Sequence, residues 1–468
     1  MNTHPSNRWP RRLLVGTDLL GSILAFFLAY WLRLKVFEPE QIFSPLVLAF
    51  ACINFLTLYV FDLYSLDPQL PLWKKPLQTI IAAAAGGTAI VLLAYLSGAI
   101  EFTGIIGRGV LIGAQVLFAL WAAYHRFWMS KRMRRVNART RWLVLGNDEA
   151  LRPFVRDLYV SNFGGYFAIL TPEGGEVVVE KKPDVPVNEA VTIQQLGSWK
   201  DLQKVASESW SAIVVAAGNA LPEDMVEILL EMRLRGTHVM DLADFYELIW
   251  YKVPVYYLQR SWFAMSQGFA LLHNPIGLKL KRVGDILGAS LLLLLASPFM
   301  ILAAIAIKLE SRGPILFSQV RVGENGEPFT VFKLRSMRTD AEKHGAQWAA
   351  KNDSRVTRVG AFIRATRIDE LPQLFNVLRG EMSFIGPRPE RPEFTGMLEK
   401  EIPFYSLRHI LRPGVTGWAQ VMYPYGASVE DAREKLQFEL YYIKNYSLLL
   451  DAAIVLKTVR VVLFGQGR

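Results

Sequence analysis

Cysteine is almost absent from this chain of 468 residues, which has only Cys52, inside an apolar run. A disulfide framework and a cysteine-based metal site are therefore excluded. The six histidines are scattered, and none has the HExxH spacing of a helical zinc site. The glycine fingerprint GxGxxG is missing as well, because the turn LGNDEA after the strand-like segment WLVLG holds one glycine, Gly146. Dinucleotide binding by that segment is therefore the weaker alternative to a regulatory or spacing role.

Apolar and basic residues are what the chain has in excess. Hydrophobic side chains make up 52% of it, clustered in a few long runs, and the formal net charge is +10. Long runs indicate a membrane protein with soluble parts. A basic balance suits anionic partners, and the runs favour lipid headgroups or phosphorylated substrates over nucleic acid. Part of the basic excess is expected to be a topology signal beside the helices.

Four apolar runs are long enough to cross a bilayer, which needs about 20 residues in each helix. They cover residues 13–32, 43–62, 79–98 and 105–124. Almost no polar stripe of helical period interrupts them, so the pattern is not that of a soluble bundle. We therefore predict a four-helix transmembrane domain in residues 1–130.

Basic residues predict the orientation of this domain, since cytoplasmic loops carry an excess of lysine and arginine. They gather before the first run, between the second and third, and after the fourth: Arg8, Arg11, Arg12, Lys74, Lys75, Lys131, Arg132, Arg134, Arg135, Arg139 and Arg141. The other two loops hold fewer, namely Arg33 and Lys35 in one and Arg108 in the other. Both ends of the bundle are therefore predicted to face the cytosol.

Residues 140–250 have a different pattern. WLVLG, YFAIL, AIVVAAG and THVMDL predict short strands, and amphipathic stretches near 198–206 and 222–235 predict helices between them. Strands that alternate with helices indicate a small Rossmann-like α/β domain with a parallel sheet.

A fifth apolar run, residues 286–307, is also long enough to span. Basic residues flank it on both sides, so they favour neither direction of crossing. Ser297 and Pro298 lie at its centre, where a proline kinks a helix and a serine hydroxyl can satisfy a freed carbonyl. A kinked transmembrane helix and a re-entrant helix that returns to the same side are both consistent with this pattern.

The segment 313–337 is dense in arginine, lysine and glycine, and its GENGEP predicts a tight turn between two strands. Lys333 and Arg335 follow that turn. A period of two places both on one face of a strand, where they could bind phosphate oxygens. A solvated basic strand is the alternative for such a pair.

Asp369 and Glu370 are adjacent carboxylates in the arginine-rich segment 359–394. Neighbouring acids on a helix point about 100° apart, so they suit separate roles rather than one shared proton. One could act as nucleophile or base and the other could bind a divalent cation that bridges substrate phosphates. The alternative is a pair of acids that merely stabilises a helix N-terminus. In the nearby GPRP, two prolines fix the backbone around Arg388, so its guanidinium loses less freedom on binding phosphate.

These segments, in this order, resemble the catalytic domain of the monotopic phosphoglycosyl transferases, also called bacterial sugar transferases. The matching pieces in residues 275–468 are KRVGDILGASLLLLLASPFMILAAIAIKLESRGPILF, QVRVGENGEPFTVFKLRSM, RATRIDELPQLFNVLRGEMSFIGPRPE, LRPGVTGWAQV and KLQFELYYIKNYS. Four spans followed by an α/β domain resemble the larger subfamily, the polyprenyl-phosphate hexose-1-phosphate transferases of exopolysaccharide, capsule and O-antigen synthesis. Residues 140–245 match that subfamily only loosely.

The resemblance implies transfer of a hexose-1-phosphate from a UDP-sugar to undecaprenyl phosphate, with release of UMP and a covalent aspartyl-phosphosugar intermediate. Asp369 would be the nucleophile, and Glu370 with Asp369 would hold Mg²⁺. Arg364 and Arg388 match family positions that contact phosphate or nucleotide. We expect an unmodified hexose and not an N-acetylated one, because the larger subfamily mostly uses unmodified hexoses.

The resemblance also implies the architecture, since Ser297 and Pro298 match the break of the family's re-entrant helix. The cytosolic donor requires Asp369 on the cytosolic side, which also favours a re-entrant fifth run. The predicted fold is a membrane protein of mixed α and α/β class. Its parts are a transmembrane domain in 1–130, a Rossmann-like domain in 140–250, a linker in 251–274 and a catalytic α+β domain in 275–468, anchored by a re-entrant helix at about 283–308.

The expected location is the bacterial inner membrane, multi-pass, with the catalytic domain in the cytosol. We expect a homodimer that binds UDP-sugar, undecaprenyl phosphate and membrane lipid, but no nucleic acid.

Two other classes of protein fit part of the chain. A membrane-anchored nucleotide-sugar dehydratase would need GxGxxG and a YxxxK pair, which are missing. A non-catalytic scaffold for polysaccharide assembly is disfavoured by the intact Asp369–Glu370 pair and the GPRP segment.

Overall fold

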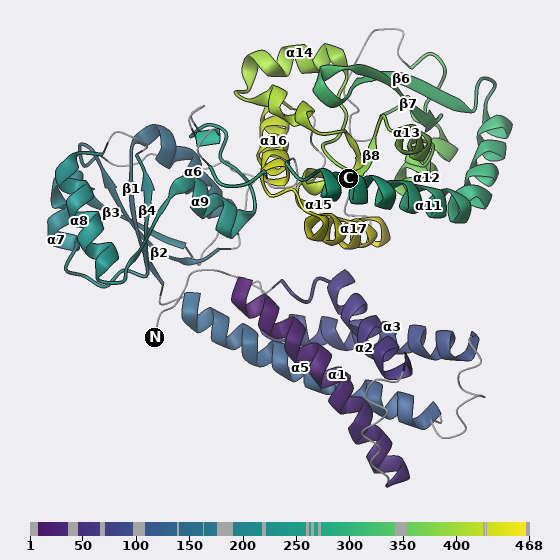
Figure 1. Cartoon of the computed structure of the whole chain (residues 1–468), viewed down its shortest axis with the longest axis horizontal. Helices are drawn as coiled ribbons and strands as arrows, with labels where there is room; N and C mark the ends of the chain where they lie inside the picture. The colour runs from purple at the N-terminus through teal and green to yellow at the C-terminus, as the bar shows by residue number, and fades with distance from the viewer. Residues whose placement is uncertain are drawn as a thin grey trace. The chain divides into compact units, whose positions relative to one another are not determined.

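The computed structural model describes two compact units, Met1–Ile249 and Trp250–Arg468 (Figure 1). The described residues are 8–35, 45–65, 71–96, 108–137, 140–161, 163–175, 191–217, 221–258, 262–263, 266–269, 273–341, 353–424, 426 and 428–464. Part of the predicted linker 251–274 lies outside them.

The first unit begins with four apolar helices, α1 (Arg8–Leu34), α2 (Pro45–Val60), α3 (Lys74–Leu96) and α5 (Arg108–Asn137). Three of them, α1, α3 and α5, are long and apolar enough to cross a membrane. The second predicted run forms a shorter helix than expected. This helix, α2, has 16 residues, which gives a length of about 24 Å. The fourth helix that could span is α11 (Pro275–Glu310), in the second unit.

Buried cations bind the turn that ends α2. Asp62 in that turn has a left-handed backbone with φ of 58°, and its amide donates to the carbonyl of Tyr59 at 2.9 Å. Just beyond α2, Lys75 Nζ donates to the carbonyl of Asp62 at 2.9 Å, and Arg126 Nε donates to that of Leu63 at 3.3 Å. Arg126 also pairs with Asp18 at 2.7 Å, and both side chains are fully buried. The apolar bundle thus holds an ion pair whose cation also binds the turn after α2.

A five-stranded parallel sheet forms the rest of the first unit. Its order is β3-β2-β1-β4-β5, with all four pairings parallel. The strands are β1 (Arg141–Gly146), β2 (Gly165–Thr171), β3 (Val191–Ser198), β4 (Ala212–Ala216) and β5 (His238–Asp241). Its α-helices are α6 (Asp148–Val160), α7 (Leu202–Val205), α8 (Glu223–Leu234) and α9 (Leu242–Phe245). The sequence pattern predicts a parallel sheet and four of these strands, and the edge strand β3 is the one that it missed.

Gly146 has a packing role at the end of β1. A Cβ atom there would lie 2.8 Å from Leu151 Cγ and 2.9 Å from Ala216 Cβ. The glycine therefore lets α6 pack closely on the sheet, and side chains fill the space above it.

The second unit is built around α11 and a short antiparallel hairpin of β6 (Leu316–Val322) and β7 (Pro328–Leu334). A parallel pair, β8 (Ser383–Ile385) and β9 (Gly414–Thr416), lies deeper in it. The remaining elements are α12 (Arg358–Ala365), the 3-10 turn η6 (Ile368–Glu370), α13 (Gln373–Arg379), α14 (Pro392–Glu401), η7 (Tyr405–Ile410), α15 (Trp418–Met422), α16 (Val429–Lys444) and α17 (Leu448–Leu463).

Both ends of α11 are bound to the same compact unit. Near its start, Asp285 accepts hydrogen bonds from the Ser383 hydroxyl and the Phe384 amide. At its end, Glu310 accepts from the amides of Arg358 and Val359 at the start of α12. A straight helix of 36 residues would be about 54 Å long, and Figure 1 shows that α11 bends instead.

The middle of α11 is apolar and uncovered within the described residues. Its large exposed side chains include Leu287, Leu291, Leu294, Leu295, Phe299, Ile301, Leu302 and Ile305. Pro298 cannot donate to the carbonyl four residues before it. That carbonyl belongs to Leu294, and the Ser297 hydroxyl donates to it at 2.9 Å. The serine thus compensates for the donor that the proline removes.

Candidate active site

Asp369 and Glu370 lie in the short turn η6 between α12 and α13. The residue before η6, Arg367, has a left-handed backbone with φ of 59°. Few residues other than glycine adopt this conformation. This turn directs both carboxyl groups into the unit, where Asp369 is 7% and Glu370 9% exposed. The pair is therefore a buried acidic site, and not the surface feature of a helix N-terminus.

Glu370 is surrounded by cations from three elements. Its Oε1 lies 2.6 Å from Arg388 Nη2 and 3.3 Å from Lys333 Nζ, and its Oε2 lies 3.9 Å from Arg367 Nη1. Burial alone would raise the pKa of Glu370, but the charges of Arg388, Lys333 and Arg367 outweigh it and hold the pKa well below its usual range. Glu370 is therefore ionised throughout the physiological pH range.

Asp369 has the opposite environment. Burial, followed by the negative charge of Glu370, raises the pKa of Asp369 to about 6, against the opposing charges of Lys333, Arg364 and Arg367. Among the described residues, its buried Oδ1 has no hydrogen-bond partner. A carboxylate oxygen with no partner is available to a substrate or a cation.

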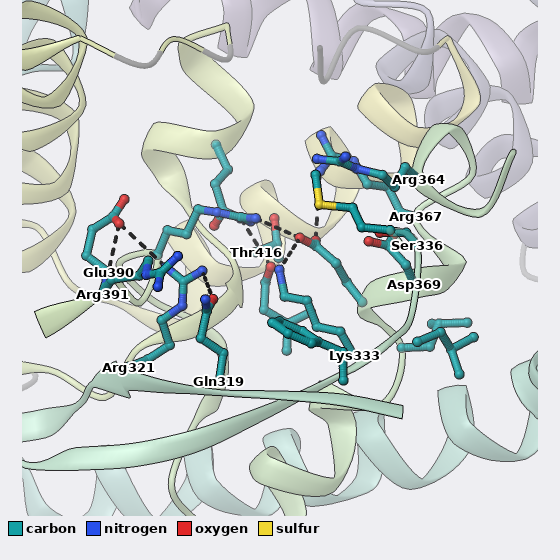
Figure 2. Close-up of a pocket in the computed structure, with 18 of the residues that line it drawn as sticks. Gln319, Arg321, Lys333, Ser336, Arg364, Arg367, Asp369, Glu390, Arg391 and Thr416 are labelled. Atoms are coloured by element: carbon teal, nitrogen blue, oxygen red, sulfur yellow. Dashed lines mark hydrogen bonds and ion pairs between the residues drawn. The ribbon is translucent and has the colours of Figure 1, made fainter. Parts of the chain in front are cut away.

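A cavity of about 1600 Å³ opens onto this pair. Figure 2 shows Lys333, Arg364, Arg367 and Asp369 around it. All six polar residues predicted for the site line the cavity: Lys333, Arg335, Arg364, Asp369, Glu370 and Arg388. Burial lowers the pKa of Lys333, although the charge of Glu370 opposes that shift. Ser297 and Pro298 are outside the lining and belong to the middle of α11.

Arg335 lines the cavity but binds the chain just after α11. Its Nη1 donates to the carbonyl of Arg312 at 2.8 Å, and its Nη2 donates to the carbonyl and the hydroxyl of Ser311 at 2.9 and 3.0 Å. The side chain is 6% exposed. Its guanidinium thus holds the end of α11 against β7, and its role in binding phosphate stays a prediction.

Comparison with known proteins identifies the family. The sequence model described as "Bacterial sugar transferase" matches residues 276–465. The chain is 54% identical to the UDP-N-acetylgalactosamine-undecaprenyl-phosphate N-acetylgalactosaminephosphotransferase of Aeromonas hydrophila, over 42% of this chain and 47% of that protein. It is 59% identical to a putative undecaprenyl-phosphate N-acetylgalactosaminyl 1-phosphate transferase of Bacillus subtilis, over 28% of this chain and 73% of that protein. The chain belongs to the bacterial sugar transferase family.

A third relative of the chain is named for another donor. The chain is 43% identical to the UDP-glucose:undecaprenyl-phosphate glucose-1-phosphate transferase of Klebsiella pneumoniae, over 40% of each protein. The matched segment therefore spans less than half the length of the Aeromonas and Klebsiella relatives. It lies in the C-terminal part of this chain, which holds the Asp369–Glu370 site.

The structure adds residues to the candidate site that the sequence pattern did not single out. Arg321 on β6 donates to Gln319 Oε1 at 2.6 Å and lies 3.5 Å from Glu390. Burial lowers the pKa of Arg321 to about 10, against the opposing charge of Glu390. Figure 2 shows Gln319 and Arg321 rising from the strand toward Glu390. The period of two in QVRV places Gln319 and Arg321 on one face, so the signal was present.

Asp369 and Glu370 are the residues that could hold the expected Mg²⁺ ion. Mg²⁺ in such enzymes usually takes one or two carboxylates and fills its other positions with water and substrate phosphates. Asp369 offers an oxygen that has no partner among the described residues, and Glu370 offers Oε2, which lies 3.9 Å from Arg367 Nη1. Among the described residues, no group of three acidic, histidine or cysteine side chains could hold a metal alone, so substrate phosphates would complete the coordination.

Proposed function

We propose that this chain transfers a sugar 1-phosphate from a UDP-sugar to undecaprenyl phosphate and releases UMP. The observation that carries this proposal is the contrast within the acidic pair. Asp369 has a buried oxygen with no partner in the described part of the chain, whereas three cations surround its neighbour Glu370. Nucleophile and electrostatic support are thus separated on adjacent residues, inside a cavity lined by Arg321, Arg364 and Arg388.

The reaction would proceed in two displacements at Asp369. First, an Asp369 oxygen attacks the sugar-proximal phosphorus of the donor, an O–P bond to the carboxylate forms, and the bond to UMP breaks. UMP leaves as an anion, which a basic cavity favours. Then an oxygen of undecaprenyl phosphate attacks the same phosphorus, and the bond to Asp369 breaks. The product is undecaprenyl diphosphate sugar, and the carboxylate is restored.

The residues around Asp369 would have separate roles in these steps. Arg388 and Arg364 would bind phosphate oxygens, since a planar guanidinium matches them in a bidentate manner. Lys333 would neutralise charge near Glu370. Bound Mg²⁺, held by Asp369 and Glu370, would supply charge neutralisation between the anionic substrates and the carboxylate.

The proposed acceptor also accounts for α11. Undecaprenyl phosphate presents its phosphate at the membrane surface, and the exposed apolar middle of α11 suits insertion beneath that surface. Since both ends of α11 bind the same unit, we propose that it is re-entrant and that the catalytic unit lies on the cytosolic side of a bacterial inner membrane.

The identity of the sugar is part of the proposal. The Aeromonas and Bacillus relatives, at 54% and 59% identity, are named for N-acetylgalactosamine. The Klebsiella relative, at 43%, is named for glucose. We therefore place UDP-N-acetylgalactosamine ahead of UDP-glucose, which departs from the preference for an unmodified hexose. The step would be the first membrane step of exopolysaccharide, capsule or O-antigen synthesis.

The test is incubation of purified protein with radiolabelled UDP-sugars, Mg²⁺ and undecaprenyl phosphate. Label should enter the lipid fraction and UMP should appear. Asp369→Asn should lower the rate by at least about a thousandfold, as expected for loss of a nucleophile, because a neutral amide cannot form the acyl phosphate. No label in lipid from any donor would support the scaffold alternative, and near-native turnover of Asp369→Asn would show that another residue is the nucleophile.

A further inference from the structure

The segment Pro387-Arg388-Pro389 has a single backbone amide that can donate a hydrogen bond. Neither proline has a backbone N–H, so Arg388 supplies the only amide donor of the three residues. The proline carbonyls on either side accept from the Gly414 amide at 2.8 Å and from Arg321 Nη1 at 3.3 Å, so what remains to be attached is the backbone of Arg388 itself. Because Arg388 binds Glu370, the placement of this segment determines where its guanidinium lies.

A buried ion pair supplies that attachment. Glu439 on α16 accepts the Arg388 amide on its Oε1 at 3.2 Å. Arg408 on η7 donates its Nη2 to the Arg388 carbonyl at 2.7 Å. The two side chains bind each other twice, through Arg408 Nη2 to Glu439 Oε1 at 2.7 Å and Arg408 Nε to Oε2 at 2.8 Å. Both backbone polar groups of Arg388 are therefore held by one pair.

The donors of Arg408 are nearly all used. A guanidinium has five N–H groups. In Arg408, Nε binds Glu439, Nη2 binds both Glu439 and Arg388, and Nη1 donates to the Tyr405 hydroxyl at 2.6 Å. Arg408 is 5% and Glu439 3% exposed. Although both line the cavity, this saturation suits a role in placing Arg388 and not in binding substrate directly.

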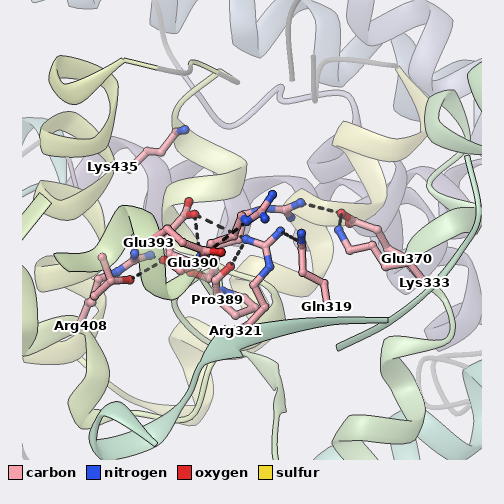
Figure 3. Close-up of polar contacts among 12 residues, drawn as sticks. Gln319, Arg321, Lys333, Glu370, Pro389, Glu390, Glu393, Arg408 and Lys435 are labelled. Carbon is pink, nitrogen blue, oxygen red and sulfur yellow. Dashed lines mark hydrogen bonds and ion pairs between the residues drawn. The ribbon is translucent and has the colours of Figure 1, made fainter. Parts of the chain in front are cut away.

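A continuous set of contacts thus leads from α16 to the acidic pair. It runs from Glu439 and Arg408 through the Arg388 backbone to the Arg388 guanidinium and then to Glu370. Figure 3 shows Arg408 and Glu370 at opposite ends of the row of polar contacts, with Pro389 and Arg321 between them.

We infer that Glu439 and Arg408 are positioning residues for Arg388, and that they set the affinity for the diphosphate of the donor through it. This inference rests on the proposed function. A buried pair that loses one partner leaves an uncompensated charge. Replacing Glu439 would therefore leave the Arg388 amide without its charged acceptor, loosen the backbone of Arg388 between the two prolines, and let Arg408 compete for the anions of the cavity.

The test is a double-mutant cycle on sugar-phosphate transfer with Glu439→Gln and Arg388→Ala. Glu439→Gln alone should lower kcat/KM on the order of 10- to 100-fold, as is usual for the supporting shell of a site, mainly through a higher KM for the UDP-sugar. In the Arg388→Ala background it should change kcat/KM by less than twofold, because the residue it positions is already gone. Glu439→Asp, which keeps the charge, should recover part of the loss.

A matched control is present on the same helix. Glu434 of α16 forms a comparably buried pair with Lys252 at 3.0 Å and is not part of the cavity lining. Glu434→Gln should lower the thermal midpoint but keep kcat/KM within twofold. If Glu434→Gln and Glu439→Gln lower kcat/KM alike, or if the effects of Glu439→Gln and Arg388→Ala multiply, the positioning role is wrong.

Failure of the proposed function can be separated from failure of this inference. If the native protein transfers no sugar phosphate, the proposed function fails. The affinity of the same variants for UMP is then measured by calorimetry and analysed as the same double-mutant cycle. A non-additive loss of UMP affinity would then support positioning of Arg388. Independent effects, or no UMP binding by the native protein, would overturn it.

Discussion

Asp369 and Glu370 are adjacent carboxylic acids whose surroundings shift their pKa values in opposite directions. The short distance from Glu370 Oε1 to Arg388 keeps Glu370 ionised. The resulting negative charge then raises the pKa of Asp369 beyond what burial does alone. The acid that would attack the donor is therefore the more basic one, which favours bond formation to phosphorus.

This coupling predicts an acidic limb in the rate profile. Asp369 must be ionised to attack, so kcat/KM should fall tenfold for each pH unit below about 6, the pKa of Asp369. In Glu370→Gln, loss of the neighbouring charge should move the inflection of the residual activity to lower pH. The measurement is kcat/KM between pH 4.5 and 8. An inflection that stays in place would mean that another group controls this limb.

Arg335 provides a second test, because two roles for it give different results. If it holds the end of α11, Arg335→Lys loses the forked contacts to Ser311 and Arg312. The free energy of unfolding should then fall by about 2 kcal/mol, or roughly 4–8 °C in thermal midpoint. The KM for the UDP-sugar should stay unchanged. A higher KM without a change in midpoint would instead support the phosphate-binding role predicted from the sequence.

The sequence predicted which residues meet at the site better than it predicted what each does. Lys333, Arg364 and Arg388 come from separate elements, yet all line one cavity with the acidic pair. What could not be predicted is which carboxylate is paired with cations and which has an oxygen without a partner among the described residues. That depends on Lys333, 37 positions away from Glu370, and on Arg388, 18 positions away. These residues are far apart in the sequence and come together only because β7 and the segment after β8 pack beside η6. No local sequence pattern encodes that packing.

At the scale of elements, hydropathy predicted the helices but not their lengths. The second run was expected to span, and α2 has only 16 residues. It ends in a turn where Asp62 has a left-handed backbone, and Lys75 of α3 and Arg126 of α5 bind carbonyls of that turn. Cations from other helices that bind inside an apolar bundle leave no mark in the run itself. A parallel sheet was predicted correctly, with four of its five strands, because those four have their own apolar pattern. The edge strand β3 was missed, since most of its residues are only partly buried and its sequence VTIQQLGS is largely polar.

The path of α11 can be tested by accessibility of single cysteines. Lys279 and Arg312 are exposed and lie near its two ends. Cysteines at these positions, in a Cys52→Ser background, should both resist a membrane-impermeant thiol reagent added to intact cells, and both should react once the membrane is opened. External labelling at position 312 alone would show that α11 crosses the membrane.

The proline in α11 gives the matching variant. Pro298→Ala restores the backbone donor for the Leu294 carbonyl and removes the cause of the bend. A straighter helix is long enough to span, so part of the population should become labelled at position 312 from outside, and activity should fall in proportion. Equal labelling of the native and Pro298→Ala helices would show that the proline does not control the path.

At the scale of the whole molecule, the second unit begins earlier than the family match. Tyr251 accepts a hydrogen bond from the Trp418 indole, Val253 donates to the carbonyl of Gln437, and Lys252 pairs with Glu434. A fragment that starts at Trp250 should therefore retain transferase activity in detergent or nanodiscs. One that starts near Leu272 loses these contacts and should have a lower thermal midpoint. A folded but inactive 250–468 fragment would mean that the first unit contributes to the site.

The bent helix α11 has a consequence for the lipid around it. A helix that enters and leaves through one surface adds its volume to a single leaflet, whereas a spanning helix adds equally to both. If α11 lies as we propose, its exposed leucines spread the acyl chains of the cytosolic leaflet alone. That leaflet gains area relative to the other, so the protein should favour membrane that is convex toward the cytosol. In vesicles with this unit outside, density per lipid should increase as vesicle diameter falls, and an even density would argue against insertion in one leaflet.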